Sequence, residues 1–176
     1  GSFPIVSAGM NDVFVMKMST AGNFIWAKSL GGTGIDLCAD AVVCDDNGNI
    51  YTIGTFSETA DLNPGTGVFE FVSAGEYDVF VSKLDTDGNF AWAKQIGGVE
   101  FDFASSIALN EYEQVFIGGT YHGTVNFGSS GLQFTGPWDF YIAKLDASGT
   151  LLSANTFGAS SGDVVKSLTV DREGNL

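Results

Sequence analysis

Short apolar runs separated by polar turns follow one another along the chain. The runs are about five to eight residues long and rich in Val, Ile, Phe, Tyr and Thr, with Gly, Asn and Asp between them, which is the pattern of strands and tight turns. No stretch has the apolar stripe of a long helix. In the first clear run, Phe14 and Met16 fall on one face, and Val13 and Val15 fall on the other. Strands that are apolar on both faces are covered on both sides, so the pattern predicts sheets packed between neighbouring sheets.

The runs belong to a larger repeating unit. Residues 12–18 read Asp-Val-Phe-Val-Met-Lys-Met, and closely similar segments return at 78–84 and at 139–145. The segments that follow them repeat in step, and recurrence at a fixed period indicates stacked copies of one supersecondary unit. Further matches pair Gly22–Lys28 with Gly88–Lys94, and Asn49–Phe56 with Gln114–Tyr121.

A unit of roughly 62 residues with four core strands and a longer insertion fits a propeller blade. We therefore expect an all-β fold of β-propeller blades, with an inner strand at 40–45. A β-solenoid is the alternative, although its coils are usually shorter and lack such hairpin turns. Gly1 and Ser2 resemble the remnant of a cleaved expression tag. The tandem repeats then cover 3–176 in units of roughly 12–77, 78–138 and 139–176, which is just under three blades.

The repeated residues resemble a known family. The succession Asp-Val-Phe-Val-x-Lys-Leu-Asp, Gly-Asn-Phe-x-Trp-Ala-Lys, Gly-Gly with Asp, and Gly-Asn-x-Tyr-x-x-Gly-Thr-Phe is similar to the SBBP-type bacterial β-propeller repeat. The resemblance implies a long secreted or cell-surface bacterial protein, often from Bacteroidetes, and it implies no particular activity. Two positions depart from the pattern: Ser153 replaces the Trp of the third unit, and Glu111–Gln114 replaces the Asp-Asn-Gly-Asn turn of the second.

Charge narrows the range of partners. The 176 residues include 21 Asp and Glu against 7 Lys and Arg, a formal net charge of −14. Nucleic acids and anionic membrane surfaces both recruit clustered Lys and Arg, so we expect no nucleic-acid partner. No apolar run approaches the roughly 18 residues of a membrane-spanning helix, so we expect no membrane insertion. A signal peptide is not recognisable, and for an exported parent protein we expect it upstream.

Fewer than three blades make an open ring, because propellers usually have four to eight blades. An open ring exposes apolar blade faces and unpaired strand edges, and both favour association. We therefore expect self-association. Either a homodimer completes a ring of about six blades, or further blades of a longer parent protein do so.

Two acidic turns have the alternating oxygen ligands of a calcium loop. Neither turn reaches a bidentate Glu at the right distance, and both also fit a hairpin turn in which Asp accepts main-chain hydrogen bonds and Gly takes a positive φ. We favour the turn and keep calcium as the alternative, with no other cofactor expected. The candidate ligands are Asp45, Asn47 and Asn49 in one turn, and Asp85, Asp87 and Asn89 in the other.

A lysine recurs once in each unit, which favours a structural role over a catalytic one. Lys17, Lys83 and Lys144 stand among apolar neighbours, where an unpaired charge is costly. We therefore expect each lysine to form an ion pair. The expected partners are the recurring Asp36, Asp102 and Asp163.

Other residues that often carry chemistry are few. Trp26 and Trp92 share one position in the repeat, which predicts blade-to-blade packing in preference to a stacking platform for sugars. Cys38 and Cys44 lie on one expected strand, ~20 Å apart, so we expect reduced and buried thiols. His122 is the single histidine, and no Ser-His-Asp or Cys-His arrangement is recognisable.

The sequence favours a non-catalytic binding or structural module of a secreted or surface-exposed bacterial protein, with adhesion or recognition of a glycan or protein as its role. Loops on a rigid scaffold usually carry recognition, so we expect the insertions 57–67 and 123–131 to face the ligand. The alternatives are a carbohydrate-active hydrolase or lyase using channel carboxylates, and a blade array whose role is length. The ligand-loop candidates are Trp138, Asp61, Asn63 and Asn126.

Overall fold

The computed structural model describes residues 3–128, 132–133, 138–159, 161–171 and 173–176. In this part of the chain the regular structure consists of strands, and no helix is long and apolar enough to cross a membrane. The strands are β1 (Val13–Met18), β2 (Phe24–Gly32), β3 (Asp36–Cys44), β4 (Ile50–Phe56), β5 (Thr59–Asp61), β6 (Glu70–Val72), β7 (Asp78–Leu84), β8 (Phe90–Ile96), β9 (Asp102–Leu109), β10 (Val115–Tyr121), β11 (Thr124–Val125), β12 (Leu132–Gln133), β13 (Asp139–Leu145) and β14 (Leu151–Phe157).

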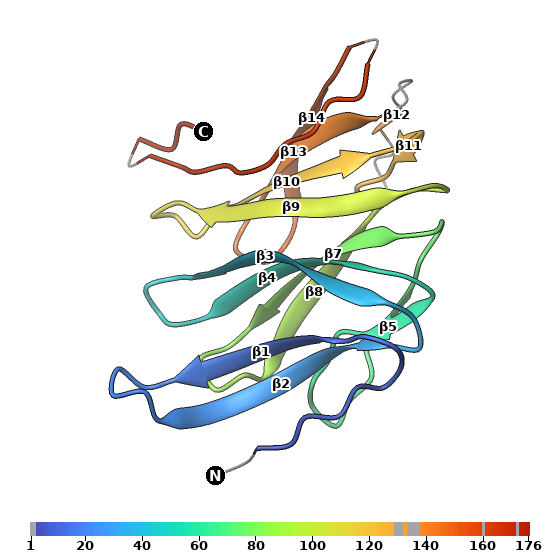
Figure 1. The fold of residues 1–176 in the computed structure, drawn as a ribbon. Coiled ribbons are helices and arrows are strands. Elements are labelled where there is room, and N and C mark those ends of the chain that lie inside the picture. The colour runs from blue at the N-terminus through green and yellow to red at the C-terminus, as the bar shows by residue number, and fades with distance from the viewer. Residues whose placement is uncertain (1–2, 129–131, 134–137, 160, 172) are drawn as a thin grey trace.

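Three four-stranded antiparallel sheets stack face to face (Figure 1). Their strand orders are β1-β2-β5-β6, β3-β4-β7-β8 and β9-β10-β13-β14. In the second and third sheets, two hairpins joined by a longer insertion form a complete blade. We call these sheets blade 2 and blade 3, and the sheet of β1 and β2 blade 1. The architecture confirms the expected all-β fold, an incomplete β-propeller of four-stranded blades with insertions.

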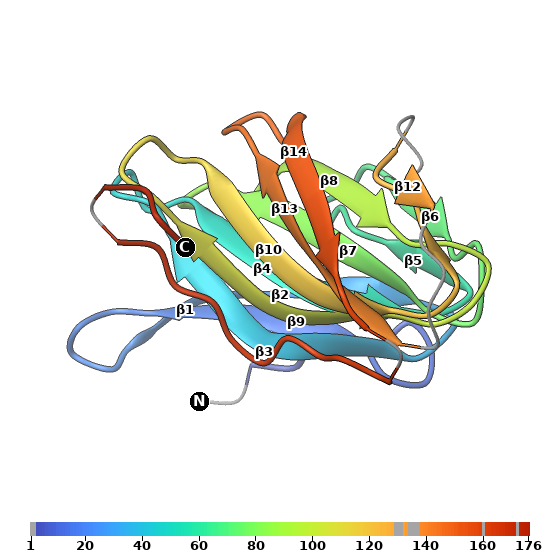
Figure 2. The same ribbon diagram turned by 90° about the horizontal axis from the view of Figure 1, so that it is seen from above.

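The blades are out of phase with the repeating sequence. Blade 2 runs from β3 to β8 and blade 3 from β9 to β14, whereas the sequence units begin at β7 and β13. β1 and β2 correspond to β7 and β8, so they are the third and fourth strands of a blade. Figure 2 shows the first strands β3 and β9 together on one side of the stack and the last strands β8 and β14 on the opposite side. The first strand of blade 2 begins at Asp36, earlier than expected.

The insertions join successive blades. The β5–β6 hairpin leaves blade 2 and pairs with the outer strand of blade 1, where Gly31 faces Asp61 and Gly32 faces Ala60. The next insertion repeats the arrangement with a bridge between Asn126 and Gly97, the residue that follows β8. A Cβ at Gly32 would overlap the carbonyl of Thr59. The repeated Gly-Gly pairs therefore permit the close approach of the insertions.

The core lies between the blades. β4 and β10 are buried along their whole length. β7 is apolar on both faces: Val79 and Val81 join the cluster shared with blade 3, and Phe80 joins the cluster shared with blade 1. The expectation of sheets covered on both sides is thereby confirmed for the central blade.

Two tryptophans form hydrogen bonds from one blade to the next. The Trp26 indole N–H of blade 1 donates to the Thr86 carbonyl in a turn of blade 2 at 3.2 Å. The Trp92 N–H of blade 2 donates in the same way to the Ala147 carbonyl of blade 3 at 3.1 Å. These contacts confirm the predicted packing role of the two tryptophans.

Candidate functional site

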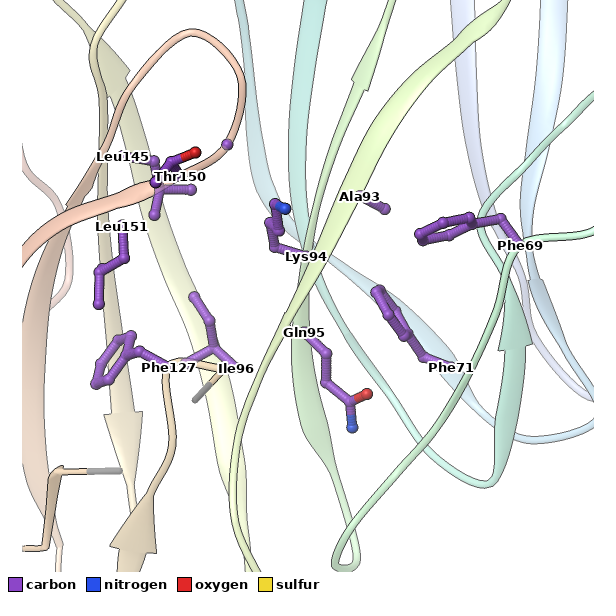
Figure 3. Close-up of a pocket in the computed structure, with 12 residues that line it drawn as sticks. Phe69, Phe71, Ala93, Lys94, Gln95, Ile96, Phe127, Leu145, Thr150 and Leu151 are labelled. Atoms are coloured by element: carbon purple, nitrogen blue, oxygen red, sulfur yellow. The ribbon is translucent and has the colours of Figure 1, made fainter. Parts of the chain in front are cut away.

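A groove of about 650 Å³ runs along the outer strand of blade 2. Figure 3 shows β8 passing through it, with Phe69 and Phe71 on one side and Phe127 and Leu151 on the other. The lining residues are Phe69, Phe71, Ala93, Lys94, Gln95, Ile96, Phe127, Gly128, Leu145, Gly149, Thr150 and Leu151.

The groove lies at the edge of a strand. It is lined by the four consecutive residues 93–96 of β8. Successive side chains of a strand point to opposite faces, so a surface that includes all four residues must follow the strand edge. β8 pairs with β7 on its other side, and beyond the bridge at Gly97 no described strand pairs with its outer edge.

The first insertion builds one wall of the groove. Asp61 Oδ1 accepts hydrogen bonds from the main-chain N–H groups of Asn63 and Phe69, both at 2.9 Å. Leu62 anchors the loop in the core and is fully buried. Asn63 Oδ1 accepts from the N–H of Gly65 at 2.9 Å. The candidates Asp61 and Asn63 therefore shape the hairpin that presents Phe69, and they do not line the groove themselves.

The second insertion supplies the opposite wall. Phe127 is buried, and its ring meets Tyr141 edge to face with centroids 5.1 Å apart. The candidate Asn126 holds this loop against β8 through paired main-chain hydrogen bonds with Gly97 at 3.0 and 3.1 Å. The Asn126 side chain is exposed and lies beside the groove, near Gln95. Of the two expected ligand-facing insertions, 123–131 contributes Phe127 and Gly128 to the groove, whereas 57–67 contributes no lining residue and the wall is built by Phe69 and Phe71 just beyond it.

The polar groups of the groove are few and held in place. Gln95 Nε2 donates to Asp78 Oδ2 at 2.6 Å and to the Val72 carbonyl at 2.8 Å. The Lys94 stem crosses the turn of blade 3, where a Cβ at Gly149 would lie 2.8 Å from Lys94 Cε. Of the twelve lining residues, Lys94 is charged and none is a carboxylate or histidine. The groove can therefore bind an apolar, extended segment, and its lining offers no acid–base pair.

Trp138 lies in a different place, in an aromatic cluster at the ends of β9 and β10. Its ring is half-buried, with centroids 6.2 Å from Phe101, 6.1 Å from Phe103 and 5.0 Å from His122. His122 Nδ1 bonds to Glu100 Oε2. A cavity of about 380 Å³ lies beside Trp138 and Phe103.

Sequence reasoning missed the Glu100–His122 pair. The signal was a departure from the repeat, because the preceding unit has Gly34 and Ser57 at the matching positions. Substitutions that break an internal repeat mark places where a blade has a local role beyond packing.

The acidic turns are held by their own hydrogen bonds. Asp85 Oδ1 accepts from the N–H groups of Asp87 and Asn89 at 2.9 and 2.8 Å, and Asn89 Nδ2 donates to Oδ2. These bonds, led by the Asn89 side chain, lower the pKa of Asp85. Among the described residues, no group of three or more His, Cys, Asp or Glu could hold a metal ion. These are the hydrogen bonds of a hairpin turn, and the other candidate turn has them too: Asn47 and Asn49 donate to Asp45.

The expected lysine–aspartate pairs were wrong. Lys83 Nζ lies 3.9 Å from both Asp45 and Glu113. Lys17 donates to Thr86, and Lys144 lies over a phenylalanine ring, 5.0 Å from its centroid. In blade 2, Asp36 aligns with Phe56 at one end of the sheet, whereas Lys83 aligns with Tyr51 at the other end, which explains the difference. The expected partners Asp36, Asp102 and Asp163 accept instead from the N–H groups of Gly32, Gly98 and Ala159.

Two of these aspartates, Asp36 and Asp102, are buried and form no ion pair with any cation that the structure describes. Asp102 is fully buried, and burial raises its pKa to about 8 despite the hydrogen bond from Gly98. Its Oδ1 is buried and has no hydrogen-bond partner within the described part of the chain. Burial also raises the pKa of Asp36, to about 6. Asp102 is therefore protonated over much of the neutral range.

Cys44 has a free thiol, as expected, but it is exposed and not buried. It lies at the end of β3 on the same face as Val42, which is 56% exposed, so this face of the strand is open at that end. The Cys38 side chain falls outside the described residues.

Comparisons with known proteins agree with the repeat architecture. No family model matches the chain. It is 26% identical over 167 residues to the regulatory protein FlaEY of Caulobacter vibrioides, covering 93% of this chain and 17% of that protein. It is 26% identical over 150 residues to the WD repeat-containing protein L264 of Acanthamoeba polyphaga mimivirus, covering 80% and 11%. The chain thus spans less than a fifth of each relative, and with its stacked blades it is a repeat-based, β-propeller-like protein.

Proposed function

We propose that this chain is a non-catalytic binding module of a secreted or surface-exposed bacterial protein, and that it captures an extended segment of a partner protein. The observation that carries the proposal is the open outer edge of β8 inside an apolar groove. A peptide that adds to such an edge gains main-chain hydrogen bonds, and its alternate side chains enter pockets on either side.

The groove suits this mode of binding. Its volume of about 650 Å³ is within the usual range of ligand sites. One wall offers Phe69 and Phe71, and the other offers Phe127 and Leu151. The chain also uses the mode internally, because β5 adds to the outer edge of β2 at Gly31 and Gly32. The secreted or cell-surface setting rests on the resemblance to SBBP-type repeats.

The test is selection of short peptides displayed on phage against the purified chain. Selected peptides should have alternating apolar residues, and the double variant Phe69→Ala with Phe71→Ala should bind them at least about ten-fold more weakly. The matched control is Tyr112→Ala, because Tyr112 is 70% exposed in a turn away from the groove. Methylation of alternate peptide nitrogens should abolish binding. Selected peptides that tolerate the double variant would overturn the proposal.

Glycan recognition is a second candidate function, favoured by the aromatic cluster around Trp138. Half-buried rings beside His122 and Glu100 combine apolar faces with hydrogen-bonding groups, as ligand sites commonly do. A glycan array tests it, with Trp138→Ala as the variant and Tyr112→Ala as the control. The groove itself does not favour a carbohydrate-active enzyme, since glycoside cleavage usually requires two carboxylates and its lining has none.

A further inference from the structure

One end of the stack has an uncovered apolar face on β1. The repeat places Phe14, Met16 and Met18 of β1 at the positions of Phe80, Ser82 and Leu84 of β7. In β7 these three side chains are fully buried. In β1 the exposed fractions are 62% for Phe14, 49% for Met16 and 49% for Met18.

The edge of β1 is also unpaired. β7 lies between β4 and β8 in its sheet, whereas β1 pairs with β2 alone among the described strands. Among the described strands, blade 1 therefore contains the third and fourth strands of a blade, and no second strand lies on the other side of the third.

The opposite end of the stack has the complementary features. Residues 163–170 repeat the sequence of β9, yet they form no strand in this structure. They lie along blade 3, where the Leu168 N–H donates to Ser106 Oγ at 3.1 Å. Figure 1 places this segment at the end of the stack away from β1 and β2. At this end, a segment with the sequence of a first strand thus packs on blade 3 without pairing with another strand among the described residues.

Blade 3 is also uncovered on its outer face. Phe157 corresponds to Leu30 and to Ile96 in the repeat. Leu30 and Ile96 are 0% and 2% exposed at the internal junctions, whereas Phe157 is 46% exposed. Phe157 stacks on Phe140, with ring centroids 5.2 Å apart.

The junction between blades 1 and 2 shows what covers such a face. There Phe80 belongs to one buried cluster with Val13 and Leu30 of the preceding sheet. By the repeat, Phe14 corresponds to Phe80, and Phe140 and Phe157 correspond to Val13 and Leu30. The two uncovered faces of this molecule are thus the two halves of a junction that it already contains.

We propose that the face of Phe14, Met16 and Met18 docks on blade 3 of a second copy, with Phe14 against Phe140 and Phe157. In that arrangement residues 163–170 of the second copy take the position of a first strand, β1 and β2 take the third and fourth positions of the same blade, and the described residues of neither copy fill the second position. The contact is head to tail, because it joins different surfaces. Two copies close a ring of about six blades, within the range of known propellers.

Size exclusion with light scattering tests the proposal, with a mass of about twice 18.5 kDa expected. Phe14→Lys and Phe157→Lys should each shift the mass to that of a monomer. The matched control Val99→Lys should remain dimeric, because Val99 is 71% exposed in a turn outside both faces. Circular dichroism checks the fold of each variant, and the milder Met16→Gln replaces any variant that unfolds.

Mixing the two variants distinguishes head-to-tail pairing from pairing of like faces. An equimolar mixture of Phe14→Lys and Phe157→Lys retains one intact junction per mixed dimer, so dimer should reappear. A monomeric wild-type chain would overturn the proposal. So would a Phe157→Lys variant that remains fully dimeric, because that result would mean pairing through β1 alone.

Discussion

Trp92 of blade 2 packs against Gly149 of blade 3. The indole N–H of Trp92 donates to the Ala147 carbonyl at 3.1 Å, and a Cβ at Gly149 would lie 3.0 Å from the indole ring. Trp26 and Gly88 form the same contact between blades 1 and 2, where a Cβ at Gly88 would lie 3.1 Å from the indole ring. A large ring resting on a bare glycine turn therefore sets the spacing of successive blades.

Truncating the tryptophan should weaken the junction in two separable steps. Trp92→Phe keeps most of the packing and loses the hydrogen bond, so we expect a loss of about 1 kcal/mol in the free energy of unfolding. Trp92→Ala also opens a cavity, and we expect a loss of about 3 kcal/mol. Urea denaturation measures both. Equal losses for the two variants would mean that the hydrogen bond, and not the ring, holds the blades.

Adding a methyl group to the glycine should separate backbone strain from the clash with the tryptophan. Gly149 has φ +79°, and its repeat equivalent Gly22 has φ +78° with nothing within 4 Å of its would-be Cβ. Gly22→Ala should cost about 1 kcal/mol through the backbone alone. Gly149→Ala should cost clearly more, measured by urea denaturation. Equal losses in the free energy of unfolding at the two sites would disprove the importance of the contact between Trp92 and Gly149.

Stability should fall as the pH rises through the neutral range. The pKa of Asp102 is about 8 in the folded chain and 3.8 ordinarily. Between about pH 4 and pH 8 the folded state thus holds a proton that the unfolded state has released. Stability decreases across that window and levels off above it. We expect Tm at pH 5 to exceed Tm at pH 8.5 by about 10 °C.

Asp102→Asn should flatten this pH dependence, because an amide keeps the acceptor for Gly98 and cannot ionise. The exposed Asp87→Asn is the matched control and should keep the wild-type slope. An unchanged slope in Asp102→Asn would show that another group, such as Asp36, dominates the titration.

Removing the Lys83 ammonium should leave Asp45 without its cation. The Lys83 side chain is 12% exposed and that of Asp45 3%. We expect Lys83→Met to cost about 3 kcal/mol, because the remaining carboxylate stays buried. Combining it with Asp45→Asn should recover part of the loss, as a double-mutant cycle by denaturation would measure. Strict additivity would mean that the two groups do not interact.

Much of the fold could be predicted from the repeat. Strand-length runs that are apolar on both faces predicted sandwiched blades, and β7 has that environment on both sides. The shared register of Trp26 and Trp92 predicted the blade junctions correctly. The candidate site was less predictable. The sequence points to Asp61 and Asn63 as ligand residues, but in the structure they hold the hairpin that carries Phe69, a residue to which no sequence pattern points.

The amino-acid sequence by itself determined the strand periods, the turns and the stacking of like units, because these depend on residues that are neighbours along the chain. The tertiary structure decided which edges meet. Whether an insertion pairs with its own blade or the preceding one, and whether Lys83 faces Asp102 or Asp45, depends on the register between distant segments. Main-chain hydrogen bonding is nearly independent of side-chain identity, so a local pattern does not specify that register. The groove exists because packing leaves the edge of β8 open between two aromatic walls.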